Sequence, residues 1–216
     1  ALPAQLLVNG GYVRDMLLDK EPDDLDISLC LRECPQDATL AAVMAEAGFH
    51  VLGVDINKLV LDQLKKGQPH IYESGLPDIL RRAIGEGKIE FAQHIPDDCQ
   101  ASVYVITVGT PLLPNGSCSM DMVENVSREV SNHLKQGDLV IMRSTVKMGT
   151  TREVVHPILE AAGVGFDLAF CPERTTEGQA LAELRQLPQV IGGTTWDATL
   201  RAAQLFQIIT PTVIRV

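Results

Sequence analysis

The sequence predicts an α/β protein built on a doubly wound, mostly parallel Rossmann-type sheet with helices on both faces. Apolar runs of strand length alternate with segments whose apolar residues recur at helical spacing. Ile106–Val108 and Val140–Met142 are continuous apolar runs, which is typical of strands covered on both faces. The length of 216 residues, 45% of them hydrophobic, suffices for one α/β core. We therefore expect a single domain over residues 1–216.

The expected strands are short and bounded by turn residues. They are Gln5–Val8, Leu25–Leu29, His50–Val54, Val103–Val108, Leu139–Arg143, Asp167–Phe170, Gln189–Gly192 and Pro211–Arg215. The expected helices are Leu40–Ala47, Lys58–Lys66, Pro77–Glu86, Met120–Leu134, Thr151–Ala162 and Thr195–Ile208. Because ligands bind outside the carboxyl ends of the strands in such sheets, functional residues are expected directly after each strand.

Charge and hydropathy narrow the class of protein. The net charge of −10 argues against bulk nucleic acid as a partner, because phosphate-backbone binding needs clustered Lys and Arg. No apolar run approaches the length of a membrane span, and the first residues do not form a signal peptide. We expect a cytoplasmic protein.

The cysteines and histidines show no metal-ligand or disulfide spacing. The five cysteines are Cys30, Cys34, Cys99, Cys118 and Cys171, and the five histidines are His50, His70, His94, His133 and His156. We expect free thiols, ordinary surface or packing roles for the histidines, and no metal site.

Two strand ends carry residues suited to a dinucleotide. Asp55 follows the strand His50–Val54, where the acidic side chain of a Rossmann unit accepts hydrogen bonds from the adenosine ribose. A helix cap or a solvated strand end explains this single residue equally well. Further along, Gly109 permits close backbone approach and Thr110 offers a hydroxyl group, although a plain turn would use the same residues.

Two further strand ends are rich in polar side chains. Residues 144–151 carry several hydroxyl groups and lead into a helix, whose amino end favours anions. Capping of that helix by Thr150 or Thr151 is the alternative, and both interpretations can hold together. Glu173 and Glu177 follow another strand, and one of these carboxylates could accept or donate a proton.

Blocks of sequence stand in a characteristic order between about Leu40 and Val216. They are Ala41–Val51, Gly53–Asn57, Ile71–Leu76, Val108–Pro111, Ser144–Val146, Gly149–Thr151, Cys171–Arg174, Glu177–Gly178 and Ile191–Gly193. In their order and in their residues these blocks resemble the UDP-glucose/GDP-mannose dehydrogenase family, in which a proline usually stands in place of Ser74.

The resemblance implies an NAD-dependent nucleotide-sugar 6-dehydrogenase, which oxidises the C6 alcohol of a UDP-sugar to a carboxylate in two steps. The sugar stays open between glucose and N-acetylhexosamines, and full-length members are expected to be homo-oligomers. The residues implied in NAD binding are Asp55 and Lys58 at the adenosine ribose, Gly109 and Thr110 along the cofactor, and Thr145 near the nicotinamide and the reacting carbon. The implied catalytic residues are Thr145, Glu173 and Glu177, since alcohol oxidation releases a proton as well as a hydride.

One departure from the family concerns its second half. The sequence ends at Val216, about where the family continues into a dimerisation helix and a substrate domain that carries the catalytic cysteine. No cysteine here lies in a matching motif, and Cys171 belongs to the block Cys171–Arg174, so we expect it to be structural. We therefore expect an NAD-binding portion that is not fully active alone.

A second departure concerns the phosphate turn. A Rossmann unit needs a glycine-rich turn between its first strand and first helix, but Leu31–Asp37 has no glycine and contains carboxylates that would repel a pyrophosphate. Gly10 and Gly11 partly match the family's turn. They lie far ahead of Asp55, however, whereas a separation of about 20 residues between the turn and the acidic residue is expected. We expect Gly10 and Gly11 to supply this turn, within an atypical composite segment over residues 1–37.

This first segment has a resemblance of its own. Asn9–Leu18 and Asp24–Ile27 look like the opening of the tRNA nucleotidyltransferase and poly(A) polymerase family, in which an Asp-x-Asp pair holds magnesium. Asp24 and Asp26 would face the same way on an extended strand, as two-metal phosphoryl transfer requires. A polar strand entry is the favoured interpretation, because no third carboxylate can be placed.

Three hypotheses follow from the sequence. The first, an NAD-binding portion of a dehydrogenase, predicts NAD binding that Asp55→Ala weakens. The second, a non-catalytic dinucleotide-binding or assembly domain, predicts a folded protein indifferent to NAD. The third, a nucleotidyltransferase fragment, predicts magnesium-dependent binding of nucleoside triphosphate that is lost with Asp24→Ala or Asp26→Ala.

Overall fold

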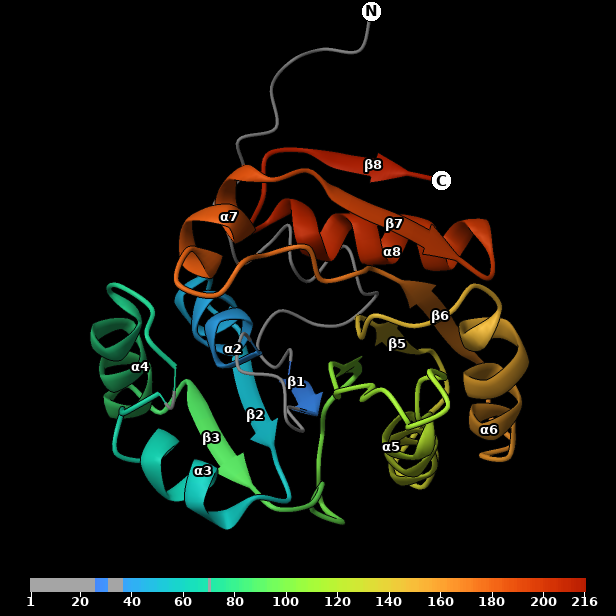
Figure 1. Cartoon of the computed structure of the whole chain (residues 1–216), viewed down its shortest axis with the longest axis horizontal. Helices are drawn as coiled ribbons and strands as arrows, with labels where there is room; N and C mark the ends of the chain where they lie inside the picture. The colour runs from blue at the N-terminus through green and yellow to red at the C-terminus, as the bar shows by residue number, and fades with distance from the viewer. Residues whose placement is uncertain (1–25, 31–36, 70) are drawn as a thin grey trace, which may run out of the picture.

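The computed structural model describes residues 26–30, 37–69 and 71–216, and within them an eight-stranded sheet (Figure 1). The strands are β1 (Asp26–Cys30), β2 (His50–Val54), β3 (Ile89–Ala92), β4 (Val103–Ile106), β5 (Asp138–Met142), β6 (Phe166–Phe170), β7 (Gln189–Gly193) and β8 (Val213–Arg215). Their spatial order is β3-β2-β1-β4-β5-β6-β7-β8. Neighbours are parallel except for the antiparallel pair β6 and β7. The predicted doubly wound, mostly parallel sheet is confirmed.

The direction of strand addition reverses at β1. From β1 the chain first builds outward through β2 and β3, and it then returns to place β4 on the other side of β1. Such a topological switch point leaves a crevice at the carboxyl ends of the strands, because the flanking connections diverge to opposite faces. The fold therefore fixes in advance where a ligand site belongs.

Helices cover both faces of the sheet. They are α2 (Asp37–Glu46), α3 (Lys58–Leu64), α4 (Leu76–Gly85), α5 (Asp121–Ser131), the π-helix η1 (Thr151–Val155), α6 (His156–Glu160), α7 (Ala180–Gln186) and α8 (Trp196–Gln207). In Figure 1, α5 and α6 lie on one side of the sheet, and α2, α7 and α8 lie on the other.

The strand β4 shows why these residues form a central strand. Val103 and Val105 belong to the core beneath α2, α4 and α8, whereas Tyr104 and Ile106 belong to the core beneath α5 and α6. Alternate side chains leave a strand on opposite faces, and here both faces are fully buried. A continuous apolar sequence over these four residues is the result, as is typical of a strand between two helical layers, although β4 ends at Ile106 and not at Val108 as predicted.

Two elements of the structure, β3 and α7, were not predicted from the sequence. The strand β3 spans four residues and alternates between buried and exposed positions, and α7 spans seven residues without a side-chain cap at its start. Neither element is long enough to build a clear period, and α7 lacks the cap that usually marks a helix start. The expected strand Gln5–Val8 lies outside the described residues.

The expected helix Thr151–Ala162 begins as a π-helix. The five residues of η1 lead directly into α6, in which Pro157 occupies the first turn. Proline has no backbone N–H, so the ordinary bond from residue 157 back to the carbonyl of Glu153 cannot form. The wider π turn is consistent with this loss, because the N–H of His156 donates instead to the carbonyl of Thr151. Over the described residues, no helix is long and apolar enough to span a bilayer.

Candidate functional site

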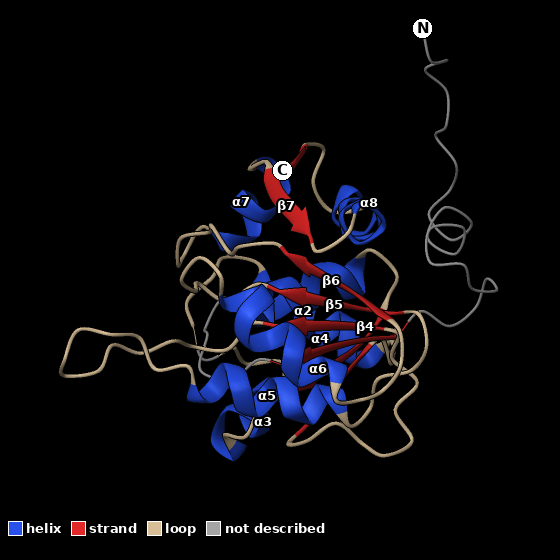
Figure 2. Ribbon diagram, turned by 90° about the vertical axis from the view of Figure 1, so that its right-hand side faces the viewer, coloured by secondary structure: helices blue, strands red, loops and turns tan. Residues whose placement is uncertain are grey.

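The expected site residues meet at one edge of the sheet. Asp55 follows β2, Thr110 follows β4, Thr145 follows β5 and Glu173 follows β6. The arrowheads of β4, β5 and β6 point the same way in Figure 2, and β1, β2 and β4 are paired in parallel. The sheet therefore places these four positions on its carboxyl edge, with Asp55 and Thr110 on the two strands that flank β1 at the switch point.

Asp55 is a buried carboxylate at the end of β2. The residue is 2% exposed, and its Oδ1 accepts a hydrogen bond of 2.7 Å from the N–H of Asn57. The cap of α3 is Asn57, whose side chain accepts from the N–H of Leu59. Asp55 is therefore neither the capping residue of α3 nor exposed to solvent, and Lys58 is exposed as the first residue of α3.

The ends of β4 and β5 are tied together by their threonines. The Thr110 hydroxyl donates a 2.8 Å hydrogen bond to the carbonyl oxygen of Thr145. Thr145 itself is exposed, and Gly109 and Thr110 are half-buried. Thr150 precedes η1 but makes no side-chain capping bond. The hydroxyl of Thr145 is thus presented at the edge of the sheet on a backbone that Thr110 holds.

Behind this edge lies a buried arginine that the sequence analysis did not single out. Arg143 is 1% exposed, and its Nε and Nη2 donate to Oε2 of Glu173 at 2.9 and 2.7 Å. Its Nη1 donates to Oε1 of Gln189 at 2.8 Å and to the Cys171 carbonyl at 3.2 Å. The guanidinium carbon lies 5.1 Å from the centre of the Phe206 ring. Arg143 therefore joins β5, β6, β7 and α8.

The Glu173 carboxylate is fully engaged. Besides Arg143, its Oε1 accepts from the N–H groups of Arg174 and Thr175 at 2.8 and 2.9 Å. Burial alone would raise the pKa of this carboxyl group, but the Arg143 charge and the hydrogen bonds outweigh burial and hold the pKa below its usual value. Glu173 is therefore ionised, and its oxygens already serve protein donors.

Cys171 has the opposite electrostatic setting. Burial raises the pKa of its thiol to about 12, against the opposing influence of Arg143. A thiol that does not ionise is a poor nucleophile. Cys171 is thus a packing residue, as expected from the sequence.

Glu177 is the freer of the two expected carboxylates. It is exposed and stands before Gly178, which has a φ of 84°. Within the part of the chain that the structure describes, its side chain has no hydrogen-bond or ion-pair partner. Glu177 is therefore available for water or a ligand, which Glu173 is not.

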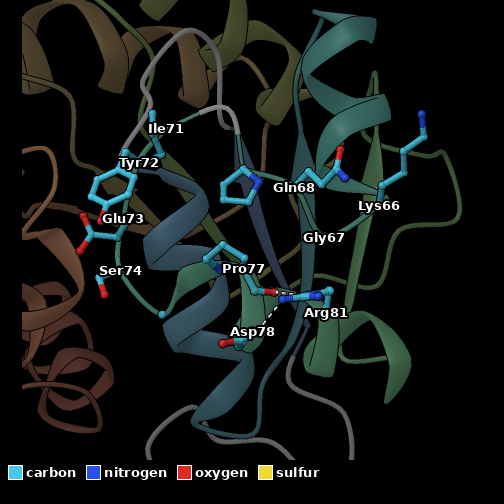
Figure 3. Close-up of a pocket in the computed structure, with 12 residues that line it drawn as sticks. Lys66, Gly67, Gln68, Ile71, Tyr72, Glu73, Ser74, Pro77, Asp78 and Arg81 are labelled. Carbon is cyan, nitrogen blue, oxygen red and sulfur yellow. Dashed lines mark hydrogen bonds and ion pairs between the residues drawn. The ribbon is translucent and has the colours of Figure 1, made fainter.

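A third buried carboxylate, Glu73, was also missed by sequence reasoning. It is 5% exposed, and it lies in the loop between α3 and α4 beside a cavity of about 580 Å³ (Figure 3). Its side chain points away from Pro77 and Arg81, and it accepts hydrogen bonds from the first two N–H groups of α7. Its position inside a matching sequence block was the signal that could have found it.

Some expected residues fall outside the described part of the chain. Gly10, Gly11 and Asp24 lie there, and Asp26 is the first residue of β1. Residues 31–36, which connect β1 to α2, contain no glycine. The roles of Gly10 and Gly11 in the phosphate turn therefore stay predictions, as does the Asp-x-Asp hypothesis.

A parallel sheet with a switch point at β1, an acidic residue at the end of β2 and threonines at the ends of β4 and β5 is typical of dinucleotide-binding α/β domains. Comparison with known families identifies one family: residues 38–210 match the NAD binding domain of the UDP-glucose/GDP-mannose dehydrogenase family. The chain belongs to this family of nucleotide-sugar dehydrogenases, and NAD is the cofactor of the matched domain.

Individual relatives agree with this assignment. The chain is 32% identical over 180 residues to UDP-N-acetyl-D-mannosamine dehydrogenase of Campylobacter jejuni. This alignment covers 78% of this chain and 44% of the relative. It is 33% identical over 165 residues to GDP-mannose 6-dehydrogenase of Pseudomonas putida. This alignment covers 72% of this chain and 38% of the relative. The chain thus spans less than half the length of these relatives.

Solved structures agree on the fold. A UDP-glucose dehydrogenase from Pyrobaculum islandicum superposes with a TM-score of 0.83 at 29% identity, over 98% of this chain and 48% of that one. A UDP-D-ManNAc dehydrogenase from Pyrococcus horikoshii gives 0.83 at 27% identity, over 89% of this chain and 47% of that one.

Proposed function

We propose that this chain is the NAD-binding portion of a nucleotide-sugar 6-dehydrogenase, which oxidises the C6 alcohol of a UDP-sugar to the carboxylate. The observation that carries the proposal is the position of Asp55, Thr110 and Thr145 at the carboxyl ends of β2, β4 and β5, around the switch point of a domain in this family. NAD supplies the hydride acceptor for such an oxidation, and the protein supplies binding, orientation and charge.

The described residues suit two parts of NAD. At one end, the buried carboxylate of Asp55 can accept hydrogen bonds from ribose hydroxyl groups, with Lys58 exposed beside it. At the other end, Gly109 and Thr110 are half-buried after β4, and Thr145 is exposed after β5, where its carbonyl oxygen is held by the Thr110 hydroxyl group. We propose that the nicotinamide lies over Thr145.

The two carboxylates after β6 would then have different roles. Glu173 is ionised and bound to Arg143, so we propose that it fixes the backbone of the segment that follows β6. Glu177 is exposed and is the better candidate to hold a water molecule or take up the proton that leaves the alcohol. Both remain active-site residues in this proposal, one by placement and one by contact.

The substrate class rests on the relatives. The relatives above are named for UDP-N-acetyl-D-mannosamine, GDP-mannose and UDP-glucose. The common chemistry is a nucleoside diphosphate attached to a hexose, and we propose a UDP-sugar. The chain spans less than half of these relatives, so the full two-step reaction would need groups other than those described here.

A second candidate is a dinucleotide-binding or assembly domain without catalysis. The observation that favours it is the connection between β1 and α2, where residues 31–36 contain no glycine and include Glu33. Glycines at this turn normally let the backbone approach a pyrophosphate, and a carboxylate there would repel it. A domain of this kind would keep the sheet but bind NAD weakly or not at all.

Calorimetric titration with NAD separates the two. We expect saturable binding that Asp55→Ala weakens at least about tenfold, since a hydrogen bond to a charged group contributes roughly 1.5–3 kcal/mol. Asp62→Ala is the matched control, because Asp62 is an exposed carboxylate on α3 and should leave the affinity unchanged. A folded wild-type protein that binds no NAD would favour the non-catalytic domain.

A further inference from the structure

Glu73 is a buried carboxylate to which none of the roles above gives a function. Its Oε2 accepts a 3.0 Å hydrogen bond from the N–H of Ala180, and its Oε1 accepts a 3.2 Å hydrogen bond from the N–H of Leu181. These residues are 107 and 108 positions away in the sequence. A loop that is distant in the sequence therefore caps the amino end of α7.

The start of α7 needs such a partner. Gln179 precedes the helix and makes no side-chain capping bond, so the first N–H groups of α7 have no acceptor within the helix itself. An ionised carboxylate is the strongest acceptor for these groups, and it also interacts favourably with the helix dipole. Glu73 thus does from a distance what an adjacent Ser, Asp or Asn does in other helices.

The turn before α7 is the one that carries Glu177. At its beginning, the N–H of Thr176 donates a 2.6 Å hydrogen bond to Oε2 of Glu183. At its end, Glu73 holds the first residues of α7. Two carboxylates from different elements therefore fix the turn on both sides of Glu177.

The loop that carries Glu73 also packs against this turn. A Cβ atom on Gly178 would lie 3.9 Å from the Tyr72 carbonyl oxygen, and a Cβ atom on Gly75 would lie 3.6 Å from Cδ2 of Leu181. An added methyl group would therefore just reach the other segment at each of these two positions, so the two segments lie close together there. The sequence block Ile71–Leu76 and the block around Glu177 meet in space.

We propose that Glu73 is a positioning residue for Glu177: it locks the turn 176–179 to the loop 71–75 and so fixes the place of the Glu177 carboxylate. This inference rests on the proposed function, because it assigns a role that matters only if Glu177 serves the reaction. It assigns a role to the sequence block Ile71–Leu76, to which the proposed function gives no other role.

The test measures the mobility of the turn in the whole chain by NMR. In Glu73→Ala, we expect the amide protons of Ala180 and Leu181 to exchange roughly tenfold faster or more, as loss of a charge-assisted bond implies. The backbone of Glu177 should also become more mobile on the nanosecond timescale. Glu73→Gln keeps one acceptor oxygen and should give a smaller effect. Asp78→Asn removes a neighbouring exposed carboxylate and should change neither quantity.

The mobility of Glu177 decides the outcome, because Glu73 does not bond to it directly. Faster exchange confined to Ala180 and Leu181, with Glu177 as ordered as in the wild type, would reduce Glu73 to a helix cap and overturn the proposal. If Glu73→Ala does not fold, Glu73→Gln carries the same comparison. A separate NAD titration of the wild type tests the proposed function, so a failure of the proposed function and a failure of the role of Glu73 can be told apart.

Discussion

The carboxyl edge of the sheet contains two regions with opposite character. Around Arg143, a buried cation and the Glu173 carboxylate have every strong partner they need within the protein. Around Thr145 and Glu177, the side chains are exposed, and Glu177 has no partner among the described residues. The comparison separates groups that build the site from groups that remain free to act in it.

The largest effect should come from breaking the first region. Arg143→Met leaves the Glu173 carboxylate buried without its cation, and we expect a loss of about 3 kcal/mol or more in the free energy of unfolding. Urea denaturation measures it. Arg152→Met, on the exposed surface of η1, is the control and should stay within about 0.5 kcal/mol. An equally small effect of Arg143→Met would show that the buried pair does not hold the edge together.

The pH dependence of stability should reveal Glu173 next. Its folded pKa lies below the ordinary value of 4.5, so it contributes stability that is fully present above that value. That contribution is lost as the pH falls through the lowered folded pKa. Glu173→Gln should cost about 2 kcal/mol near neutral pH and flatten this acid dependence. Urea midpoints of the wild type and Glu173→Gln, measured between about pH 3 and 7, test this. The same dependence of the midpoint on pH in the two proteins would contradict the ion pair.

A smaller effect is expected where the two regions meet. Thr110→Val keeps the shape of the side chain but removes the donor to the Thr145 carbonyl, which should cost about 1 kcal/mol. NAD affinity should fall as well, whereas Thr110→Ser should retain both properties. Equal behaviour of the two variants would mean that the hydroxyl group does not hold Thr145.

The smallest effect on stability should come from the second region. Glu177→Gln removes an exposed charge and should change the free energy of unfolding by less than about 0.5 kcal/mol. Thermal or urea denaturation checks this directly. A loss as large as that of Glu173→Gln would show that Glu177 is structural and would remove the contrast between the two carboxylates.

The sequence predicted what long periodic segments and strand ends encode. Continuous apolar runs such as Val140–Met142 predicted central strands, and the position of Asp55 directly after a strand made it a candidate for ribose binding, because both signals are local. The short elements β3 and α7 were missed for the same reason, since too few residues carry their period.

The partners of the site residues were not predictable in this way. Arg143 contacts Gln189 and Phe206, and Glu73 contacts Ala180, only in the folded chain. No spacing in the sequence encodes such contacts, which join residues 46 positions apart for Arg143 and Gln189 and 107 positions apart for Glu73 and Ala180. The difference between Glu173 and Glu177 likewise depends on burial, which the sequence block that contains them does not reveal.

The central claim is that NAD binds at the carboxyl edge beside β1, and chemical-shift mapping tests it most directly. Titration of the isotope-labelled chain with NAD should shift the backbone amide signals of Asp55, Gly109, Thr110 and Thr145, and leave Lys88 and Ala101, which precede β3 and β4, unchanged. The absence of shifts at saturating NAD, or shifts centred on Lys88 and Ala101, would contradict it.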